Sequence, residues 1–256
     1  MAFVVLGGTA AIRFDALWRT LDGAMGNSRE ITDPLEAGRM WVVVATIAIN
    51  VAVVTLLTLA PWCDWRSAVE LNVIDNVLLV GYVLLRGDRV LARLIVFGLV
   101  AGVVELAADA WLVDYTRTLD YSVGGSPMLW RSPLWMPFAW EVVAVQFGYL
   151  GLRLRERFSV AGLAAIGLLG AINIPYYEEM ARRIRWWQYS GCRMISGTPY
   201  YIILGELLIA VSLALLVKGF RRATLGKAAL MGVAAGGAIF VSYAIAYGLT
   251  DGLFRR

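Results

Sequence analysis

Carboxyl side chains stand inside stretches of this sequence that are otherwise apolar. Glu105 and Asp109 are four residues apart and therefore share one face of a helix, while Glu141 and Glu206 lie in two further apolar stretches. A protonated carboxylic acid can donate a proton to a substrate, and an ionised neighbour can accept one. These residue types therefore point to general acid–base chemistry in an apolar environment.

The sequence contains no histidine. This excludes histidine-ligated haem, histidine-based zinc or di-iron sites and a histidine general base. We therefore expect carboxylic acids to be the proton donors, and we expect no metal and no other cofactor.

Composition places these carboxyl groups in a membrane. Hydrophobic residues make up 60% of the 256 residues and charged residues 16%, and the mean hydropathy is +0.69. Soluble domains are nearer half apolar and a quarter charged. Several stretches of about twenty residues carry almost no charge, which is the length that a helix needs to cross the hydrocarbon core. The predicted fold is an all-α, polytopic integral membrane helical bundle of about seven transmembrane helices, at about 40–61, 67–85, 90–113, 134–152, 158–175, 199–217 and 228–250.

Two segments are expected to lie outside these helices. Residues 1–39 predict an N-terminal cytoplasmic or interfacial segment, and residues 40–256 predict a single transmembrane domain. Residues 176–190 predict an interfacial amphipathic helix, because Met180, Ile184 and Trp187 would form an apolar stripe along it.

The last expected helix contains Gly232, Gly236 and Gly237. Small residues at this spacing allow a second helix to approach closely. We expect a contact within the chain more readily than a dimer.

Basic residues set the expected orientation. Most of the 23 lysines and arginines fall on the side of the N-terminus if seven helices cross, so the positive-inside rule places that terminus in the cytoplasm. The membrane is expected to be a bacterial cytoplasmic (inner) membrane. Asp75, Glu105, Glu141 and Glu206 then lie about 10–12 Å below the outer helix ends. Charges at such depth are costly unless they face the bundle interior, pair or become protonated. This coincidence predicts a carboxylate-lined cavity in the outer half of the bundle.

Roles within this cavity follow as hypotheses. Glu141 is the preferred catalytic acid, with Glu105, Asp109 and Glu206 as base or orienting partners. An arginine such as Arg182 would meet an anionic substrate group. The expected substrate-binding residues are Asp75, Trp140, Asn173, Tyr177, Glu178 and Arg182. In the alternative interpretation, the buried acids only join helices through hydrogen bonds.

Aromatic residues at the start of the fourth expected helix suggest the same chemistry. Rings that face Glu141 could stabilise a carbocation in a polyene or isoprenoid substrate. The tetrapeptide Phe138-Ala139-Trp140-Glu141 resembles a segment of the small membrane-integral terpene cyclases of meroterpenoid pathways, in which a glutamate protonates the substrate. The resemblance covers four residues, and those enzymes carry the segment on an earlier helix.

Cys63 and Cys192 are the only cysteines, and both fall in loops assigned to the outside. An oxidising compartment would permit a disulfide between them, although the sequence supplies no distance. A disulfide and two thiols are both compatible with the sequence.

The leading hypothesis is a metal-independent enzyme that cyclises, isomerises or hydrates a lipid or isoprenoid substrate. The first alternative is a non-catalytic accessory subunit of a photosynthetic or respiratory complex, with other membrane subunits or a carotenoid-like ligand as partners. The second is a proton-coupled transporter, although the inner halves of the helices offer no polar path. Membrane-flanking arginines account for the net charge of +4, so no nucleic acid partner is expected.

Overall fold

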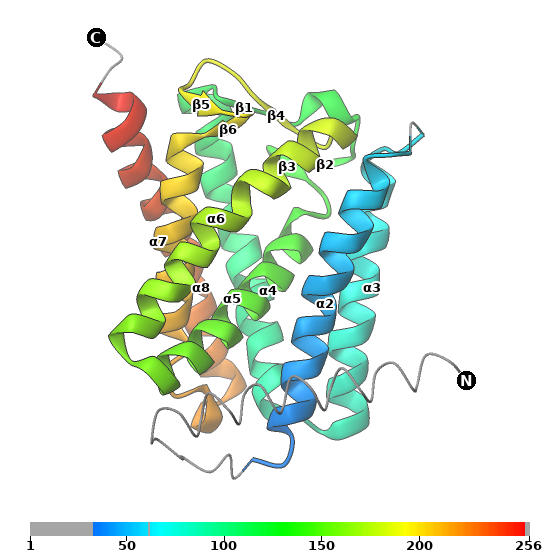
Figure 1. Cartoon of the computed structure of the whole chain (residues 1–256), viewed down its shortest axis with the longest axis vertical. Coiled ribbons are helices and arrows are strands. Elements are labelled where there is room, and N and C mark those ends of the chain that lie inside the picture. Colours follow the sequence, from blue (N-terminus) through cyan, green and yellow to red (C-terminus); the bar gives the residue numbers. More distant parts are fainter. Residues whose placement is uncertain (1–32, 61, 254–256) are drawn as a thin grey trace. The chain divides into compact units, whose positions relative to one another are not determined.

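Seven long helices make up most of the part of the chain that the structure describes. The computed structural model describes residues 33–60 and 62–253. In these ranges the long helices are α2 (Glu36–Leu57), α3 (Trp65–Arg86), α4 (Arg89–Ala110), α5 (Met136–Phe158), α6 (Val160–Ile184), α7 (Tyr200–Leu216) and α8 (Leu225–Tyr247). Figure 1 shows the helices of residues 42–253 side by side, with their axes roughly aligned. The predicted all-α class is confirmed.

Short strands gather at one end of these helices, where α6 ends and α7 begins (Figure 1). They form three antiparallel pairs. The pairs are β1 (Leu119–Asp120) with β4 (Gln188–Tyr189), β2 (Met128–Leu129) with β3 (Ser132–Pro133), and β5 (Met194–Ile195) with β6 (Thr198–Pro199). We call this end of the bundle the hairpin end. The π-helical turns η1 (Trp111–Thr116) and η4 (Gly248–Gly252) extend α4 and α8 at their C-terminal ends, and the 3-10 turns are η2 (Ser122–Gly124) and η3 (Phe220–Arg222).

Five helical segments in the described ranges are long and apolar enough to cross a membrane: Glu36–Leu57, Trp65–Arg86, Arg89–Thr116, Val160–Ile184 and Leu225–Gly252. The remaining two long helices differ from them. Helix α7 is apolar but has only 17 residues, and α5 carries arginines in its last turn. The chain is therefore an all-α protein with five helices suited to span a membrane, and a count of seven spans stays a prediction.

Local sequence signals explain where the helices begin and end. Asp64 caps the start of α3 by accepting a hydrogen bond from the backbone N–H of Arg66. The turn into α4 uses Gly87 in the left-handed region, where glycine has no Cβ to clash. Asp88 then caps α4 by accepting from the N–H groups of Val90 and Leu91. A two-residue connection thereby reverses the chain between α3 and α4.

The separate interfacial helix expected over 176–190 does not form. Helix α6 instead continues through Pro175 to Ile184. Neighbouring helices can satisfy the backbone group that a proline frees, so proline is tolerated inside membrane helices. The helix ends at Arg185 in the left-handed region, where the N–H groups of Arg185 and Trp186 bond to the carbonyls of Arg182 and Ala181.

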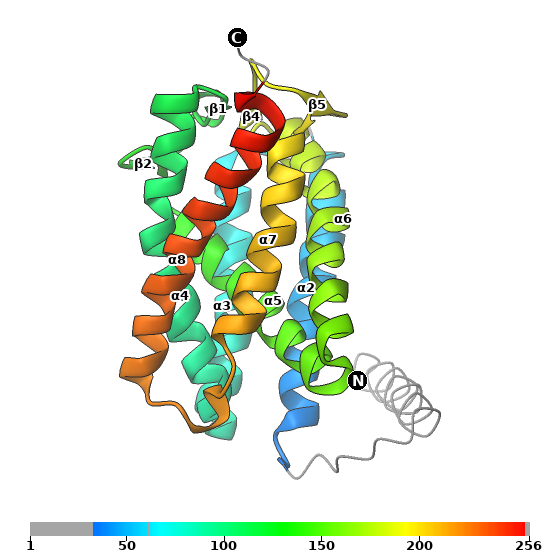
Figure 2. The same ribbon diagram turned by 90° about the vertical axis from the view of Figure 1, so that its left-hand side faces the viewer.

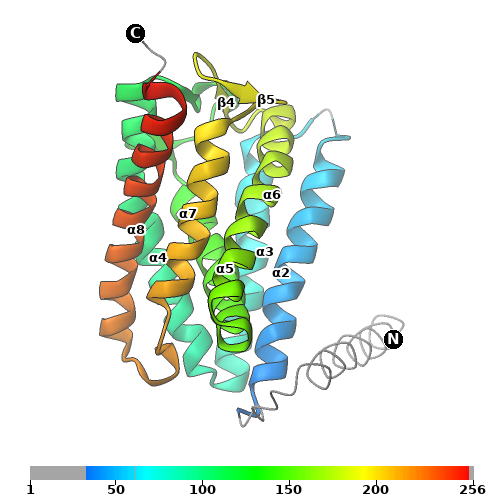
Figure 3. The same cartoon turned by 60° about the vertical axis from the view of Figure 1, so that its left-hand side comes forward.

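Helix α4 packs closely against α5 and α8 through glycines. A Cβ at Gly102 would lie 2.2 Å from the carbonyl oxygen of Pro137 on α5, and one at Gly236 would lie 2.5 Å from Cβ of Val104 on α4. Gly232 also faces α4, whereas Gly237 faces open space. The predicted contact of this glycine-rich helix is therefore within the chain. Figures 2 and 3 show α8 beside α4 on one side of the bundle, with α7 next to them and then α6.

The chain divides into two units, residues 1–41 and 42–256. In the described part of the first unit, the buried guanidinium of Arg39 donates to Asp33 at 3.0 Å and to Glu36 at 2.8 Å. The cytoplasmic or interfacial segment expected over residues 1–39 falls largely outside the described residues and stays a prediction.

We predict that Gly236→Ala lowers the free energy of unfolding by about 1–3 kcal/mol, because the new methyl group must displace Val104 or the backbone of α4. Gly237→Ala is the matched control, because its methyl group meets no atom within 4 Å. Thermal unfolding of both variants in the same detergent measures the difference. Equal unfolding temperatures would show that α4 and α8 do not approach as described.

Candidate functional site

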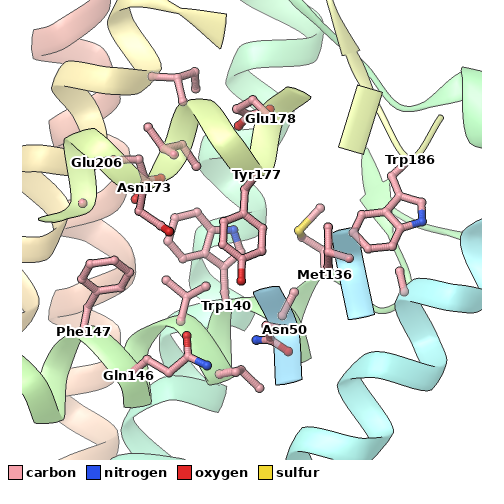
Figure 4. A pocket seen from close by; sticks show the side chains of 18 of the residues that line it. Asn50, Met136, Trp140, Gln146, Phe147, Asn173, Tyr177, Glu178, Trp186 and Glu206 are labelled. Atoms are coloured by element: carbon pink, nitrogen blue, oxygen red, sulfur yellow. The ribbon is translucent and has the colours of Figure 1, made fainter. Parts of the chain in front are cut away.

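A cavity of about 300 Å³ lies between the helices, in residues 42–253. Its wall comes from α2, α3, α5 and α6, with further side chains from α4, α7, α8 and the loops at the hairpin end. Figure 4 shows Tyr177 and Trp140 projecting into it from α6 and α5, with Asn50 and Gln146 lower in the same view. Most of the lining is apolar or aromatic, as in sites that bind small organic molecules.

Three carboxyl groups on this wall each accept a hydrogen bond from a tyrosine that also lines the cavity. We call them the three acid–tyrosine pairs. Asp109 accepts from Tyr121 at 2.8 Å, Glu178 from Tyr189 at 3.2 Å, and Glu206 from Tyr243 at 2.6 Å.

Further donors reach two of these acids. Ser132 donates to Oδ2 of Asp109 at 2.7 Å, and the indole N–H of Trp187 donates to Oε2 of Glu178 at 2.5 Å. Both oxygens of Glu178 are thus engaged. Only Oε1 of Glu206 takes part in its bond to Tyr243.

One strand pair positions two of the tyrosines. The pairing of β1 with β4 sets Leu119 opposite Tyr189 and Asp120 opposite Gln188. The side chain of Gln188 also donates to Asp120 at 3.1 Å. Tyr121 directly follows β1 in the chain, so a single pairing brings two hydroxyl groups, distant in sequence, to neighbouring acids.

A glycine positions the third tyrosine. A Cβ at Gly205 on α7 would lie 2.4 Å from the ring of Tyr243 on α8. The absence of a side chain at this position lets the ring cross α7 and reach Glu206. The sequence offers only a glycine within an apolar helix as a signal of this arrangement.

Three tryptophans form a second feature of the wall, which we call the tryptophan wall. The ring centroids of Trp135, Trp186 and Trp187 lie 5.8–6.2 Å apart, and Tyr121 lies 6.1 Å from Trp187. Trp186 is anchored to α3 because its indole N–H lies 3.2 Å from Oγ of Ser67. The indole nitrogen of Trp135 is buried without a hydrogen-bond partner in the described residues.

Burial controls the ionisation of the two loop tyrosines. It raises the pKa of Tyr121 and of Tyr189 well above 10, and the nearby carboxyl groups of Asp109 and Glu178 add to the shift. Both phenols therefore remain protonated at neutral pH and act as hydrogen-bond donors to the acids.

Most of the residues predicted from the sequence line the cavity. The structure brings these predicted residues together from five helices, α3 to α7: Asp75, Asp109, Trp140, Asn173, Tyr177, Glu178 and Glu206. The tyrosine donors and the tryptophan wall were not predicted as site residues.

Glu141, the expected catalytic acid, is buried but is not part of the cavity wall. It lies where α5 crosses α4, with its carbonyl oxygen against Gly98. Adjacent residues point about 100° apart around a helix, so Trp140 lines the cavity whereas Glu141 does not. The expectation that Glu141 faces the cavity is therefore not met.

Glu105 also lies behind the wall rather than on it. Its two carboxyl oxygens are buried without a hydrogen bond of regular geometry to the described residues, and Asp109 and Trp140 are polar neighbours that act on it. Glu105 therefore acts on the cavity from behind its wall.

Arg182 does not face the cavity. Its guanidinium pairs with Glu179 at 2.9 Å on the exposed side of α6, and Arg183 pairs with the same carboxylate at 2.8 Å. Because an α-helix turns about 100° per residue, Glu178 faces inward while Glu179 faces outward. The expected contact between Arg182 and an anionic substrate group is therefore not supported.

Of the two alternatives left open by the sequence, the structure has two thiols, because Cys63 and Cys192 are not bonded to each other. Their surroundings differ. Cys63 follows α2 and has Asp64 and Glu70 as charged neighbours, whereas Cys192 interacts electrostatically with Tyr201 in α7. Within the described ranges, no group of three or more cysteine, aspartate or glutamate side chains is arranged to hold a metal ion.

One comparison with known proteins gives a match. A family described as "Domain of unknown function (DUF6989)" matches residues 106–250, more than half of the chain. No curated protein and no solved structure matches the sequence or the fold.

We predict that Tyr121→Phe leaves the alkaline absorbance titration of the folded protein unchanged up to about pH 11, because a phenol with a raised pKa does not ionise there. A raised pKa also means that stability decreases as the pH rises above the value of the unfolded chain. In denaturant, the variant should show the signal of one tyrosine fewer, which is the control. A smaller amplitude in the folded variant would contradict the burial of Tyr121.

Both cysteines should react with a thiol reagent in unfolded protein that was never exposed to reductant. Peptide mapping of the alkylated protein measures this. Recovery of a peptide that links Cys63 to Cys192 would contradict the structure.

Proposed function

The chain belongs to the family DUF6989, a domain of unknown function, and we propose from its own cavity that it carries out acid–base chemistry on a lipid or isoprenoid substrate. The reaction classes are cyclisation, isomerisation or hydration of a double bond. The observation that carries this proposal is the set of three acid–tyrosine pairs on one apolar, aromatic wall.

The surroundings of the acids support proton transfer to carbon. An apolar cavity limits the access of water, which would otherwise add to a carbocation or remove a proton from it. Several carboxyl groups in one such cavity cannot all carry a charge, so protonated and ionised forms coexist. This provides a proton donor and a proton acceptor within one site.

The roles are assigned from geometry. Glu206 is the proposed acid, because its second carboxyl oxygen is not used by Tyr243. It adds a proton to one carbon of a double bond and leaves a carbocation on the other. Asp109 is the proposed base and removes a proton from a neighbouring carbon, which restores a double bond and a neutral product. Attack by a second double bond before that step closes a ring and forms a new carbocation, which loses a proton from carbon to Asp109. Attack by water forms an oxonium ion, which becomes an alcohol when Asp109 removes a proton from its oxygen.

The remaining wall residues have supporting roles in this proposal. Trp140 presents an aromatic face to the cavity, and such faces stabilise positive charge. Glu178 is engaged at both oxygens by Trp187 and Tyr189, which suits binding better than proton transfer. Glu105 interacts with Asp109 from behind the wall and can take up the transferred proton.

The membrane placement is part of the proposal. We infer that all seven helices cross a bacterial cytoplasmic membrane, with the N-terminus in the cytoplasm and the cavity in the outer half. Five helices suited to span a membrane support this, as do the arginines gathered in the last turn of α5 and in η3 at the opposite end from the strands. An interfacial role of the exposed arginine-rich face at the end of α6 fits the same placement.

The test is deuterium transfer from solvent to carbon. Protein in lipid nanodiscs is incubated in D₂O with a polyprenol mixture and with the total lipid extract of the host membrane, and products are analysed by mass spectrometry. We predict a lipid product with deuterium on carbon. Glu206→Gln and Asp109→Asn should each lower its rate by about 10²–10⁴-fold, because each removes a proton-transfer group.

Glu179→Gln is the matched control, because it removes a carboxylate from the outer face of the same bundle. Glu141→Gln separates the proposal from the assignment made from sequence, since only the latter requires Glu141. Incorporation no higher than in nanodiscs without protein, or full activity in both Glu206→Gln and Asp109→Asn, would reject the proposal.

A further inference from the structure

The cavity has two chemically different ends. On α5 its lining extends from Trp135 to Leu150, which is about 22 Å along a helix at 1.5 Å per residue. Leu150 and Phe147 face Ile166 and Leu169 of α6 at one end, where the lining is apolar. The tryptophan wall, Asp109 and Glu178 stand at the other. An elongated molecule with one polar end fits this division.

The cavity lining is acidic, and its described residues carry no positive charge. Four carboxyl side chains belong to the lining, namely those of Asp75, Asp109, Glu178 and Glu206, and none of the described lining residues is a lysine or an arginine. The two arginines that follow closely on α6 are paired with Glu179 on the exposed side. An anionic head such as a phosphate or carboxylate would be buried beside acids with no counter-charge, which is strongly unfavourable.

Two buried acceptors on this wall lack a donor. Oδ1 of Asp75 and Oδ1 of Asn50 have no hydrogen-bond partner of regular geometry in the described residues, although the two side chains are polar neighbours. Both side chains are more than nine-tenths buried. Buried polar atoms in native proteins are almost always paired. A ligand that brings N–H or O–H groups to this wall would supply the missing partner.

The aromatic residues favour a cation among such donors. Trp187 lies beside both Trp135 and Tyr121, and its N–H is bonded to Glu178. Aromatic faces attract ammonium groups, and a neighbouring carboxylate adds a counter-ion. Acid, aromatic ring and unpaired acceptor all favour the same kind of head group.

We propose that the cavity binds amphiphiles with an ammonium head, with the head among Asp75, Asp109 and Glu178 beside the tryptophan wall and the tail toward Leu150 and Ile166. A carboxyl group that releases its proton to water gains the ammonium ion as its counter-ion. This selection of ligands goes beyond the proposed function, because it holds whether the bound molecule reacts or not.

The test uses three probes that share one ten-carbon isoprenoid tail and differ only in the head: geranylamine, geraniol and geranate. Binding to the protein in nanodiscs is measured by calorimetry, with protein-free nanodiscs subtracted for partition into lipid. We expect geranylamine to bind at least ten times more tightly than geraniol, and geranate to bind more weakly than both. Equal affinity of the amine and the alcohol, or tighter binding of geranate, overturns the proposal.

Adjacent residues provide the matched variants. Glu178→Gln should weaken geranylamine at least ten-fold and leave geraniol within about two-fold, whereas Glu179→Gln should change neither. Asp75→Asn is a second variant for the case that Glu178→Gln lowers the unfolding temperature. It should likewise weaken the binding of geranylamine and leave that of geraniol within about two-fold. If Glu178→Gln and Asp75→Asn both keep the selectivity for geranylamine over geraniol, the assigned position of the head group is rejected.

These outcomes are distinct from those of the deuterium test. Selective binding of geranylamine without any deuterium transfer would support the ligand class and reject the reaction. Deuterium transfer with equal binding of all three probes would support the reaction and reject the ligand class.

Discussion

A buried carboxyl group in a membrane bundle requires a hydrogen-bond donor from the protein, because the hydrocarbon around the helices supplies none. Asp109, Glu178 and Glu206 meet this requirement in the same way, through a tyrosine hydroxyl. The three hydroxyl groups come from the loop after β1, from β4 and from α8. These three bonds therefore tie the loop after β1 and strand β4 to α4 and α6, and tie α8 to α7.

Depth within the bundle could be predicted from the sequence because it follows from counting. A helix rises 1.5 Å per residue and consecutive helices run in opposite directions, so the positions of Asp75 and Glu206 along their helices fix their level. The structure places both on one cavity. Helix number and fold class were predictable for a related reason, since long apolar stretches bounded by charged or turn residues leave few alternatives. Agreement on seven long helices concerns the fold, and the number that cross a membrane is a separate question.

The facing of each side chain could not be predicted in this way. Trp140 and Glu141 share a depth, but a helix turns by about 100° between them, and the close approach of α4 at Gly98 decides which one meets the cavity. Apolar residues surround both, so the sequence has no amphipathic pattern to distinguish them. The tyrosine donors were missed for another reason. Tyr121 and Tyr189 belong to loops that meet only through the pairing of β1 with β4, and no periodic signal in the sequence records a pairing of two-residue strands.

The cavity exists because the helices pack unequally. Glycines on α4 and α8 bring α4, α5 and α8 into close contact, whereas α2 is joined to α5 and α6 through side chains, by a bond from Gln146 to Thr46 at 3.1 Å and one between Tyr176 and Thr55 at 2.5 Å. Backbones that meet at glycine leave no room for a ligand, while helices held apart by polar side chains leave the space that aromatic rings line. Hydrogen bonds are directional and strong in an apolar medium, so they can fix α2 at this greater separation. Hydrogen bonds between polar side chains thus also keep the cavity open on the side of α2.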